Sequence, residues 1–204
     1  RRTEFVGTGH ELLPVLTKHM VAYAKLHYAF VSNFRSHIAM WPSWTEVVEW
    51  YWGVLCDAAK DGASVALHHD DDDDMVMYPY RWIVLSLRLL HATLDRWQRN
   101  RPAGTMFAGA SGAQFELQMV DVLLKTYLRL TPTDLERWQA HPEQFAIEED
   151  QGDDELDIRP AATELMRALS RHSFRSGKGA APEVPNVSDY MWMQFEASAQ
   201  WPLT

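Results

Sequence analysis

Apolar residues recur at intervals of three and four along most of the chain, which is the period of an amphipathic α-helix. Strand-like alternation is nearly absent. The first helical stretch spans residues 10–34, and Pro14 lies near its first turn, where proline is tolerated. Its inward stripe is predicted to contain His27 and a set of large apolar residues, namely Leu13, Leu16, Met20, Tyr23, Phe30 and Phe34.

A second helix is predicted to begin at Ser43, which forms a capping-box pattern with Glu46 three residues later. Asp61 and Gly62 end it. The third helix opens at Pro79 and ends at residues 100–102. The inward positions are Trp44, Val47, Val48, Tyr51, Leu55 and Ala58 in the second helix, and Ile83, Leu87, Leu90, Leu94 and Trp97 in the third.

A fourth helix is predicted over about residues 113–130, and residues 131–134 break it and start a short helix through Trp138. A fifth covers about residues 159–172. The inward positions are Leu117, Val120, Leu123, Leu124 and Tyr127 in the fourth, and Ala162, Leu165 and Leu169 in the fifth. Residues 174–185 are predicted to form a flexible linker, and residues 186–204 one more short helix of undetermined packing.

Broad apolar faces joined by short breaks favour an all-α fold of antiparallel helix hairpins stacked side by side. The first helix pairs with the second and the third with the fourth, and the fifth starts a third hairpin. Residues 1–173 are therefore predicted to form one array of helix hairpins. The hairpins are spaced more widely than the about 40–47 residues of a HEAT repeat, so periodicity leaves a solenoid and a bundle both open.

The composition limits the classes of partner that the chain is expected to bind. With 47% hydrophobic residues and nine Trp, the chain can build a packed core. Its net charge of -9 argues against general nucleic-acid binding, since phosphates would be repelled, and favours basic partners. No apolar run is long enough for a membrane-spanning helix. Cys56 is predicted to be a buried thiol. The chain begins at Arg1 without Met, so we expect a piece of a longer protein.

Two acidic segments are candidate partner contacts. One contains Asp70, Asp71, Asp72, Asp73 and Asp74, and the other contains Glu148, Glu149, Asp150, Asp153 and Asp154. Adjacent His68 and His69 and consecutive carboxylates lack the spacing of a metal site. The first segment fits either a contact with basic cargo or a solvated loop without a partner. The second also has a local role, because its charges favour the N-terminus of the fifth helix.

Motifs for catalysis and cofactor binding are incomplete. Pro14 stands where a zinc-protease pattern starting at His10 needs its second histidine. A phosphate-loop pattern around Lys178 lacks both its leading glycine and the following Ser or Thr. We therefore predict neither enzyme activity nor a cofactor. The Trp and Met content indicates packing between helices rather than ligand pockets, with some apolar grooves left exposed.

One stretch, residues 127–165, has a more specific pattern. A helix ends, a short helix with Trp138 follows, and Pro142-Glu143-Gln144-Phe145 then forms a turn before an acidic loop and a helix that starts at Arg159. This order resembles the importin-β (karyopherin-β) family of nuclear transport receptors, in particular the C-terminal half of its importin-eleven-like branch. His141 departs from the acidic residue usual before the proline. A looser resemblance covers residues 10–172, and the tail after residue 173 does not fit.

The resemblance implies that residues 1–173 form HEAT-like repeats of a superhelix. Such a receptor binds protein cargo, Ran-GTP and Phe-Gly nucleoporins, and it shuttles between cytoplasm and nucleus through the nuclear pore. Trp138 and Phe145 are expected to pin the short helix and the turn, Pro142 to set the turn, and Arg159 to begin the next helix. No residue for Ran, cargo or Phe-Gly binding can be carried over. Alternatives are an exportin-branch receptor, a HEAT-type scaffold or regulatory subunit, and a helical metal-dependent enzyme using His68, His69 and the aspartates that follow them.

Overall fold

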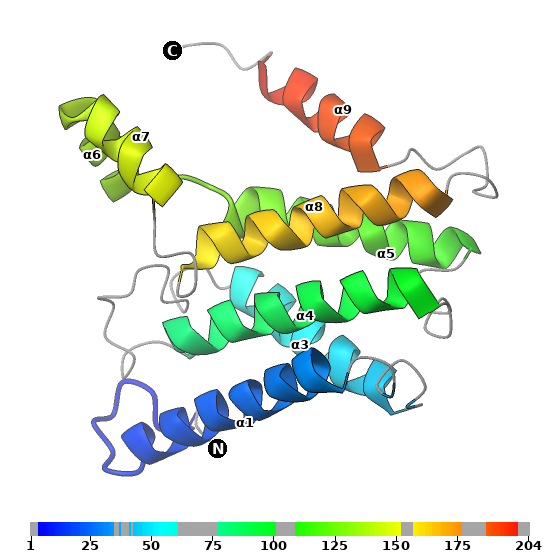
Figure 1. Cartoon of the computed structure of the whole chain (residues 1–204). Coiled ribbons are helices and arrows are strands. Elements are labelled where there is room, and N and C mark those ends of the chain that lie inside the picture. Colours follow the sequence, from blue (N-terminus) through cyan, green and yellow to red (C-terminus); the bar gives the residue numbers. More distant parts are fainter. Residues whose placement is uncertain are drawn as a thin grey trace.

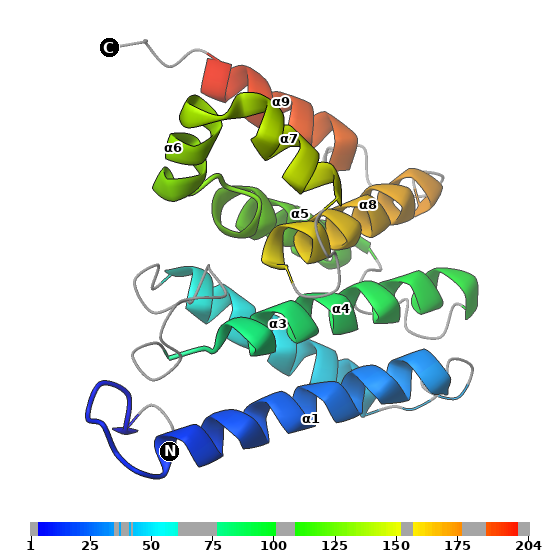
Figure 2. The same cartoon turned by 60° about the vertical axis from the view of Figure 1, so that its left-hand side comes forward.

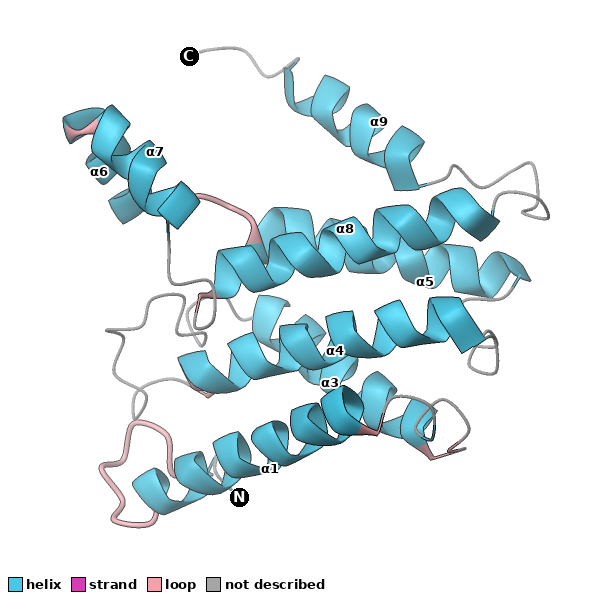
Figure 3. Ribbon diagram, viewed as in Figure 1, coloured by secondary structure: helices cyan, strands magenta, loops and turns pink. Residues whose placement is uncertain are grey.

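The computed structural model describes residues 4–34, 37, 41, 43–60, 77–100, 109–151, 157–176 and 187–199. Within this part of the chain the regular elements are helices (Figure 3). They are α1 (Leu13–Asn33), α3 (Trp44–Lys60), α4 (Tyr80–Asn100), α5 (Gly109–Val122), the π-helical turn η2 (Leu123–Tyr127), α6 (Pro132–Ala140), α7 (Pro142–Gln151), α8 (Ile158–Ser176) and α9 (Val187–Ala199).

Three long helices lie side by side in one layer. α4 packs against α1 on one side and against α8 on the other (Figure 1). α3 and α5 lie behind this layer, where α3 contacts α4 and α5 contacts α8. α9 packs on both α8 and α5. The chain is thus an α-solenoid of stacked antiparallel helix hairpins, as predicted, in which α9 completes the hairpin that α8 begins.

The central helix, α4, is buried around most of its circumference because it has neighbours on three sides. The predicted stripe is confirmed at Ile83, Leu87, Leu90 and Leu94. Trp82, Val84 and Leu89 lie outside that stripe and are buried as well. Ser86 is also buried, and its hydroxyl donates a hydrogen bond to the Trp82 carbonyl at 2.7 Å. A single-stripe pattern therefore underestimates how deeply α4 lies in the stack.

The predicted inward face of α1 is partly wrong. Leu13 is buried as expected, but Tyr23 is 62% exposed and Phe34 is 52% exposed. Ala24 and Val31 take the buried positions instead. The reason is that α1 is apolar on two sides. A small residue such as Ala24 lets the neighbouring helix approach closely, and the large aromatic side chains project away from that helix.

The predicted fourth helix is α5 continued by η2. The Leu128 N–H donates to the Leu123 carbonyl, five residues earlier, at 2.8 Å, which is the hydrogen bond of a π turn. Leu123 and Tyr127 are buried as predicted. The Tyr127 hydroxyl donates to the Leu55 carbonyl at 2.8 Å, so η2 is tied to α3 in the same layer.

The predicted Pro-Glu-x-Phe turn is wrong, because these residues begin a second helix, α7. Pro142 follows His141, the residue that ends α6, and proline is favoured at the first position of a helix. Glu143 adds an acidic residue to the first turn, which the helix dipole favours. α6 and α7 pack on each other and form a hairpin that stands beside the main stack (Figures 1 and 2).

The last long helix of the layer, α8, begins at Ile158 and runs to Ser176, beyond the predicted end at residue 172. Gly177 is the first helix breaker after the predicted end, so nothing in the sequence stops α8 before Ser176. Residues 177–186, most of them in the predicted linker, lie outside the described residues.

Candidate functional site

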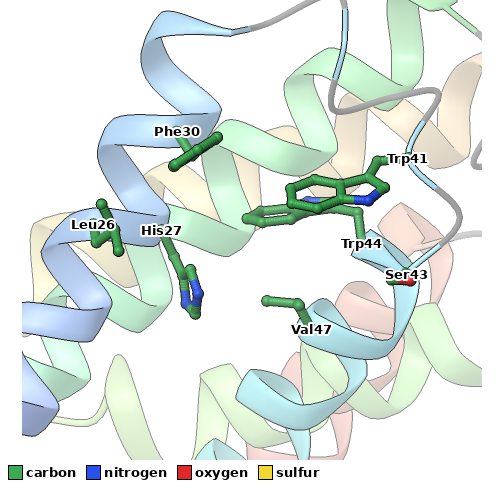
Figure 4. A pocket seen from close by; sticks show the side chains of 7 residues that line it. All are labelled: Leu26, His27, Phe30, Trp41, Ser43, Trp44 and Val47. Carbon is green, nitrogen blue, oxygen red and sulfur yellow. The ribbon is translucent and has the colours of Figure 1, made fainter.

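An open apolar groove lies between the C-terminal half of α1 and the start of α3 (Figure 4). The lining residues are Leu26, His27 and Phe30 from α1, together with Trp41, Ser43, Trp44 and Val47. Its volume is about 250 Å³, slightly below the about 300–1,000 Å³ typical of small-molecule sites. The groove therefore suits one bulky side chain better than a free small molecule.

Two tryptophans give the groove its shape. Trp44 is buried, and its Nε1 donates to the Thr93 hydroxyl of α4 at 3.3 Å, which fixes the indole. Trp41 stacks on Trp44 with a centroid distance of 6.4 Å and an interplanar angle of 17°. Phe30 lies 6.3 Å from Trp41, centroid to centroid. Because Trp41 is 52% exposed, the groove offers a fixed aromatic floor and one solvent-facing aromatic wall.

His27 and Ser43 bring polar side-chain atoms to the groove. The His27 Nδ1 shares a hydrogen bond of 2.9 Å with the Tyr51 hydroxyl, and the His27 ring meets Trp44 edge-on at 6.1 Å. Burial lowers the pKa of His27, which favours the neutral ring. Apart from this histidine, none of the lining residues can carry a charge. The groove is thus mainly apolar, and it can bind an aromatic or aliphatic side chain.

The predicted acidic contacts either lie outside the described residues or have side chains that are not described. Asp70–Asp74, Asp153 and Asp154 lie outside the described residues. Glu148, Glu149 and Asp150 belong to α7, but their side chains are not described. The residues that follow the two segments do meet, since the Tyr80 hydroxyl donates to the Asp157 carboxylate. The Ile158 N–H donates to the Tyr80 oxygen at 3.3 Å, so the starts of α4 and α8 adjoin.

Among the predicted structural residues, Arg159 has a clear contact. Its Nη2 lies 2.6 Å from the Asp134 carboxylate, which joins the start of α8 to the start of α6. Phe145 is half-buried, and the Arg137 guanidinium lies 5.9 Å above its ring. Trp138 does not pin α6 as expected, because it is 51% exposed. An ion pair, rather than an aromatic anchor, therefore connects the α6–α7 hairpin to α8.

The described part of the chain also bears on metal binding, thiol reactivity and membrane insertion. It contains no group of three or more His, Cys, Asp or Glu side chains that could hold a metal ion. Burial raises the pKa of the Cys56 thiol to about 11, which keeps it protonated, as predicted for a buried cysteine. None of the helices searched combines the length and hydropathy needed to cross a bilayer.

Sequence reasoning missed the groove because it assigned Phe30, Trp44 and Val47 to the core. The aromatic residues that cluster between Phe30 and Trp44 were the available signal. Since they span the end of one helix and the start of the next, they must meet at the hairpin tip. A helical stripe cannot show that one of them, Trp41, lies half in solvent.

Comparisons with known proteins find a solved structure with a similar fold and no matching sequence family. No protein-family profile matches the chain, and no curated protein matches it. A solved structure with a similar fold is Lph2, a novel bidirectional nuclear transport receptor of S. cerevisiae. The two are 20% identical with a TM-score of 0.59, over 87% of this chain. The chain spans 17% of the length of Lph2, so it is similar to a short stretch of that structure.

Proposed function

We propose that this chain is a segment of an importin-β-type nuclear transport receptor, of the importin-eleven-like branch, that binds protein cargo under the control of Ran-GTP. In this function it moves between cytoplasm and nucleus through the nuclear pore. The observation that carries the proposal is the fold shared with Lph2 over 87% of the chain. The order of motifs in residues 127–165 supports the family separately, because it is a property of the sequence alone.

The decisive experiment measures binding of the chain to Ran loaded with GTP and, separately, with GDP. A marked preference for the GTP form supports the receptor function. Cargo that is displaced by Ran-GTP indicates import, and cargo that binds together with it indicates export. Because Lph2 is much longer than this chain, the measurement is repeated on the protein that contains the chain. Equal binding or none at all, in both, leaves a HEAT-type scaffold without a transport role.

The groove between α1 and α3 is the proposed contact for Phe-Gly nucleoporins. It is uncharged, open to solvent and bordered by aromatic rings, which suits the side chain of a phenylalanine in an extended peptide. Burying one such side chain contributes about 1.5–3 kcal/mol, which gives a weak and reversible contact. Rapid passage through a pore needs many contacts of this kind rather than one strong one.

A titration with a Phe-Gly peptide tests the groove, and NMR chemical-shift changes of the aromatic residues report the binding. Trp41→Ala removes the exposed wall of the groove and is expected to weaken binding about tenfold, which corresponds to losing about 1.4 kcal/mol of that contact. Trp138→Ala is the matched control, because the two indoles are 52% and 51% exposed and only Trp41 lines the groove. Equal effects of the two variants would remove the groove from the proposal.

The acidic segments are the proposed contacts for basic cargo. The contact between Tyr80 and Asp157 brings together the residues that follow the two segments, although 77 positions separate them in sequence. Charges contributed from both segments would then act on the same partner. Replacing Asp70–Asp74 by Asn is expected to slow the association of basic cargo, and the effect should shrink at high salt. An unchanged rate constant at low salt would exclude this segment as a cargo contact.

A further inference from the structure

The helices of the stack differ in charge between its two sides. α1, α4 and α8, which form one layer, contain ten Lys and Arg residues, two in α1 and four in each of the others, against two acidic residues. Their hairpin partners, namely α3, α5 with η2, and α9, contain seven acidic residues against two lysines. Because the whole chain has a net charge of -9, the first layer is a basic region in an acidic molecule.

In the central helix, α4, the described cations lie on the side that faces solvent. α1, α3 and α8 cover the other sides of α4. Its exposed and half-buried positions include Arg81, Leu85, Arg88 and Ala92, which are spaced by four, three and four residues and so share one stripe of the helix. This stripe therefore faces away from α3, on the side of the layer that is turned to the viewer in Figure 1.

The two lysines of α1 point to the same side. Lys18 and Lys25 are exposed and seven residues apart, so they lie nearly in line along the helix. His27 shares a hydrogen bond with Tyr51 and so marks the side of α1 that faces α3. Lys25 precedes His27 by two residues, which is about 200° around the helix. Both lysines therefore lie on the side of α1 that is turned away from α3.

Two arginines continue the positive charge on α8. Arg167 and Arg171 are exposed and lie about one turn apart. Arg167 pairs with Glu164 of its own helix at 2.5 Å, but both side chains are largely exposed, so a carboxylate of a partner can compete for it. We call the cations on this side of the layer the basic face, which consists of Lys18, Lys25, Arg81, Arg88, Arg167 and Arg171.

The spacing of the basic face suits an extended polypeptide. Seven helical residues correspond to about 10 Å, and packed helices lie about 8–10 Å apart, so cations recur about every 10 Å along α1 and α4 and from helix to helix. An extended chain advances about 3.3 Å per residue, so every third side chain of an acidic peptide can meet a cation.

A nucleic acid suits the basic face less well. Proteins that bind single strands stack the bases on exposed aromatic rings. Among the described residues, the large exposed aromatic side chains lie outside α4 and α8, and in α1 they lie on the side towards α3. The net charge of the chain also repels a phosphate backbone at long range.

We propose that the basic face binds an acidic segment of a partner protein, which lies in extended form across α1, α4 and α8. The contact does not depend on the transport function, because it rests only on the charge of one side of the stack. Units of a solenoid stack on its two ends, so this side stays open when the chain continues in a longer protein. Each exposed ion pair changes affinity by about fivefold at most, so several pairs act together.

Fluorescence anisotropy of a labelled oligoglutamate peptide, titrated with the whole chain at low salt, is the first test. The peptide is expected to bind, and to bind more weakly as salt rises, because salt screens exposed charges. Absence of binding at low salt overturns the proposal. A single-stranded oligonucleotide of matched length is titrated in parallel. Tighter binding of the oligonucleotide would also overturn the proposal, because it would assign the face to nucleic acid.

Charge reversal tests whether the basic face is the contact. Lys25→Glu and Arg81→Glu are each expected to weaken binding of the peptide about threefold to tenfold. Lys60→Glu is the matched control, because it changes the net charge by the same amount and Lys60 is an exposed residue of α3, outside the basic face. An equal loss in the control would show that overall charge, rather than the basic face, attracts the peptide.

Backbone NMR maps the contact directly. Chemical-shift changes are expected in α1, α4 and α8, and changes confined to α3, α5 and α9 would overturn the proposal. The three altered residues are exposed, and a thermal melt of each variant checks that it folds. Binding of Ran-GTP is measured without this peptide, so failure of the basic face and failure of the transport function remain distinguishable.

Discussion

The Asp134 carboxylate at the start of α6 is buried and depends on three donors. The Thr131 N–H and hydroxyl donate to it at 2.8 and 2.7 Å, and the Arg159 guanidinium lies at 2.6 Å. Thr131 thereby forms a capping box with Asp134, and Arg159 supplies the positive charge. A buried carboxylate is costly unless it is both paired and hydrogen-bonded. This single group therefore holds the α6–α7 hairpin to α8.

Arg159→Met is expected to lower the free energy of unfolding by about 1–3 kcal/mol, because it leaves the Asp134 carboxylate buried without its cation. Urea unfolding measures this. Arg167→Met, on the same helix, is the matched control. Arg167 pairs with Glu164 at 2.5 Å, but both side chains are largely exposed, so the expected change is about 0–1 kcal/mol. Equal losses would contradict the role given to Arg159.

His27 is expected to make stability depend on pH. Burial lowers its pKa in the folded state below the usual value of 6.5. As the pH falls below about 6.5, the unfolded chain binds a proton on this residue more readily than the folded chain, so stability decreases. The decrease continues until the pH reaches the lowered folded pKa and then levels off.

Unfolding experiments between pH 7.5 and 5 test this, with His27→Gln compared against His19→Gln on the exposed side of the same helix. His27→Gln is expected to flatten part of the pH dependence, and His19→Gln controls for replacing an imidazole by an amide on the same helix. Parallel curves for the two variants would show that burial of His27 does not drive the effect.

At the scale of the element, α1 shows how an apolar pattern can mislead. Its positions allow two stripes, one with Tyr23 and Phe34 and one with Ala24 and Val31. Ranking by size selects the aromatic stripe, whereas packing selects the smaller residues because they permit close helix contact. Neighbours in space decide between the two, and a single helix does not contain that information.

Substitutions on the two faces of α1 are expected to differ sharply in their effect on the free energy of unfolding. Ala24→Leu adds volume at a position that is 0% exposed and should cost about 1–3 kcal/mol through overpacking. Tyr23→Ala removes a much larger group from an exposed position and should change stability by less than about 0.5 kcal/mol. Thermal melting distinguishes them. A larger loss for Tyr23→Ala would restore the face that the sequence pattern favoured.

The other elements show what sequence reasoning can reach. The stripe of α3 and most of α4 were predicted correctly, because strong periodicity and clear boundaries such as Pro79 agree. α7 was missed because Pro142 was taken as the start of a turn. Proline is equally well suited to the first position of a helix, and Pro142 takes that position in α7. The groove was missed because it combines parts of two helices with the exposed Trp41. The groove forms only when these helices come together in the folded chain, so a local sequence pattern does not predict it.

For the whole molecule, α4 is the helix on which the stack depends. It contacts α1, α3 and α8, whereas α9 contacts only α8 and α5 among the helix pairs that pack extensively in the described chain. In a solenoid each unit is stabilised by its neighbours, so loss of a central unit removes two interfaces and loss of a terminal unit removes one. Stability should therefore fall toward the ends of the stack.

Leu87→Ala in α4 is expected to cost about 2–5 kcal/mol, because it leaves a cavity at a position that is 0% exposed. Since α4 joins its neighbours, amide hydrogen exchange should accelerate together in α1, α3 and α8. Val187→Ala, at the start of α9, also removes buried volume, since Val187 is 1% exposed. Its effect should stay within α9, because a terminal helix can open alone. If Leu87→Ala accelerated exchange in α4 only, the helices would be shown to fold independently, and the stack would not be a single cooperative unit.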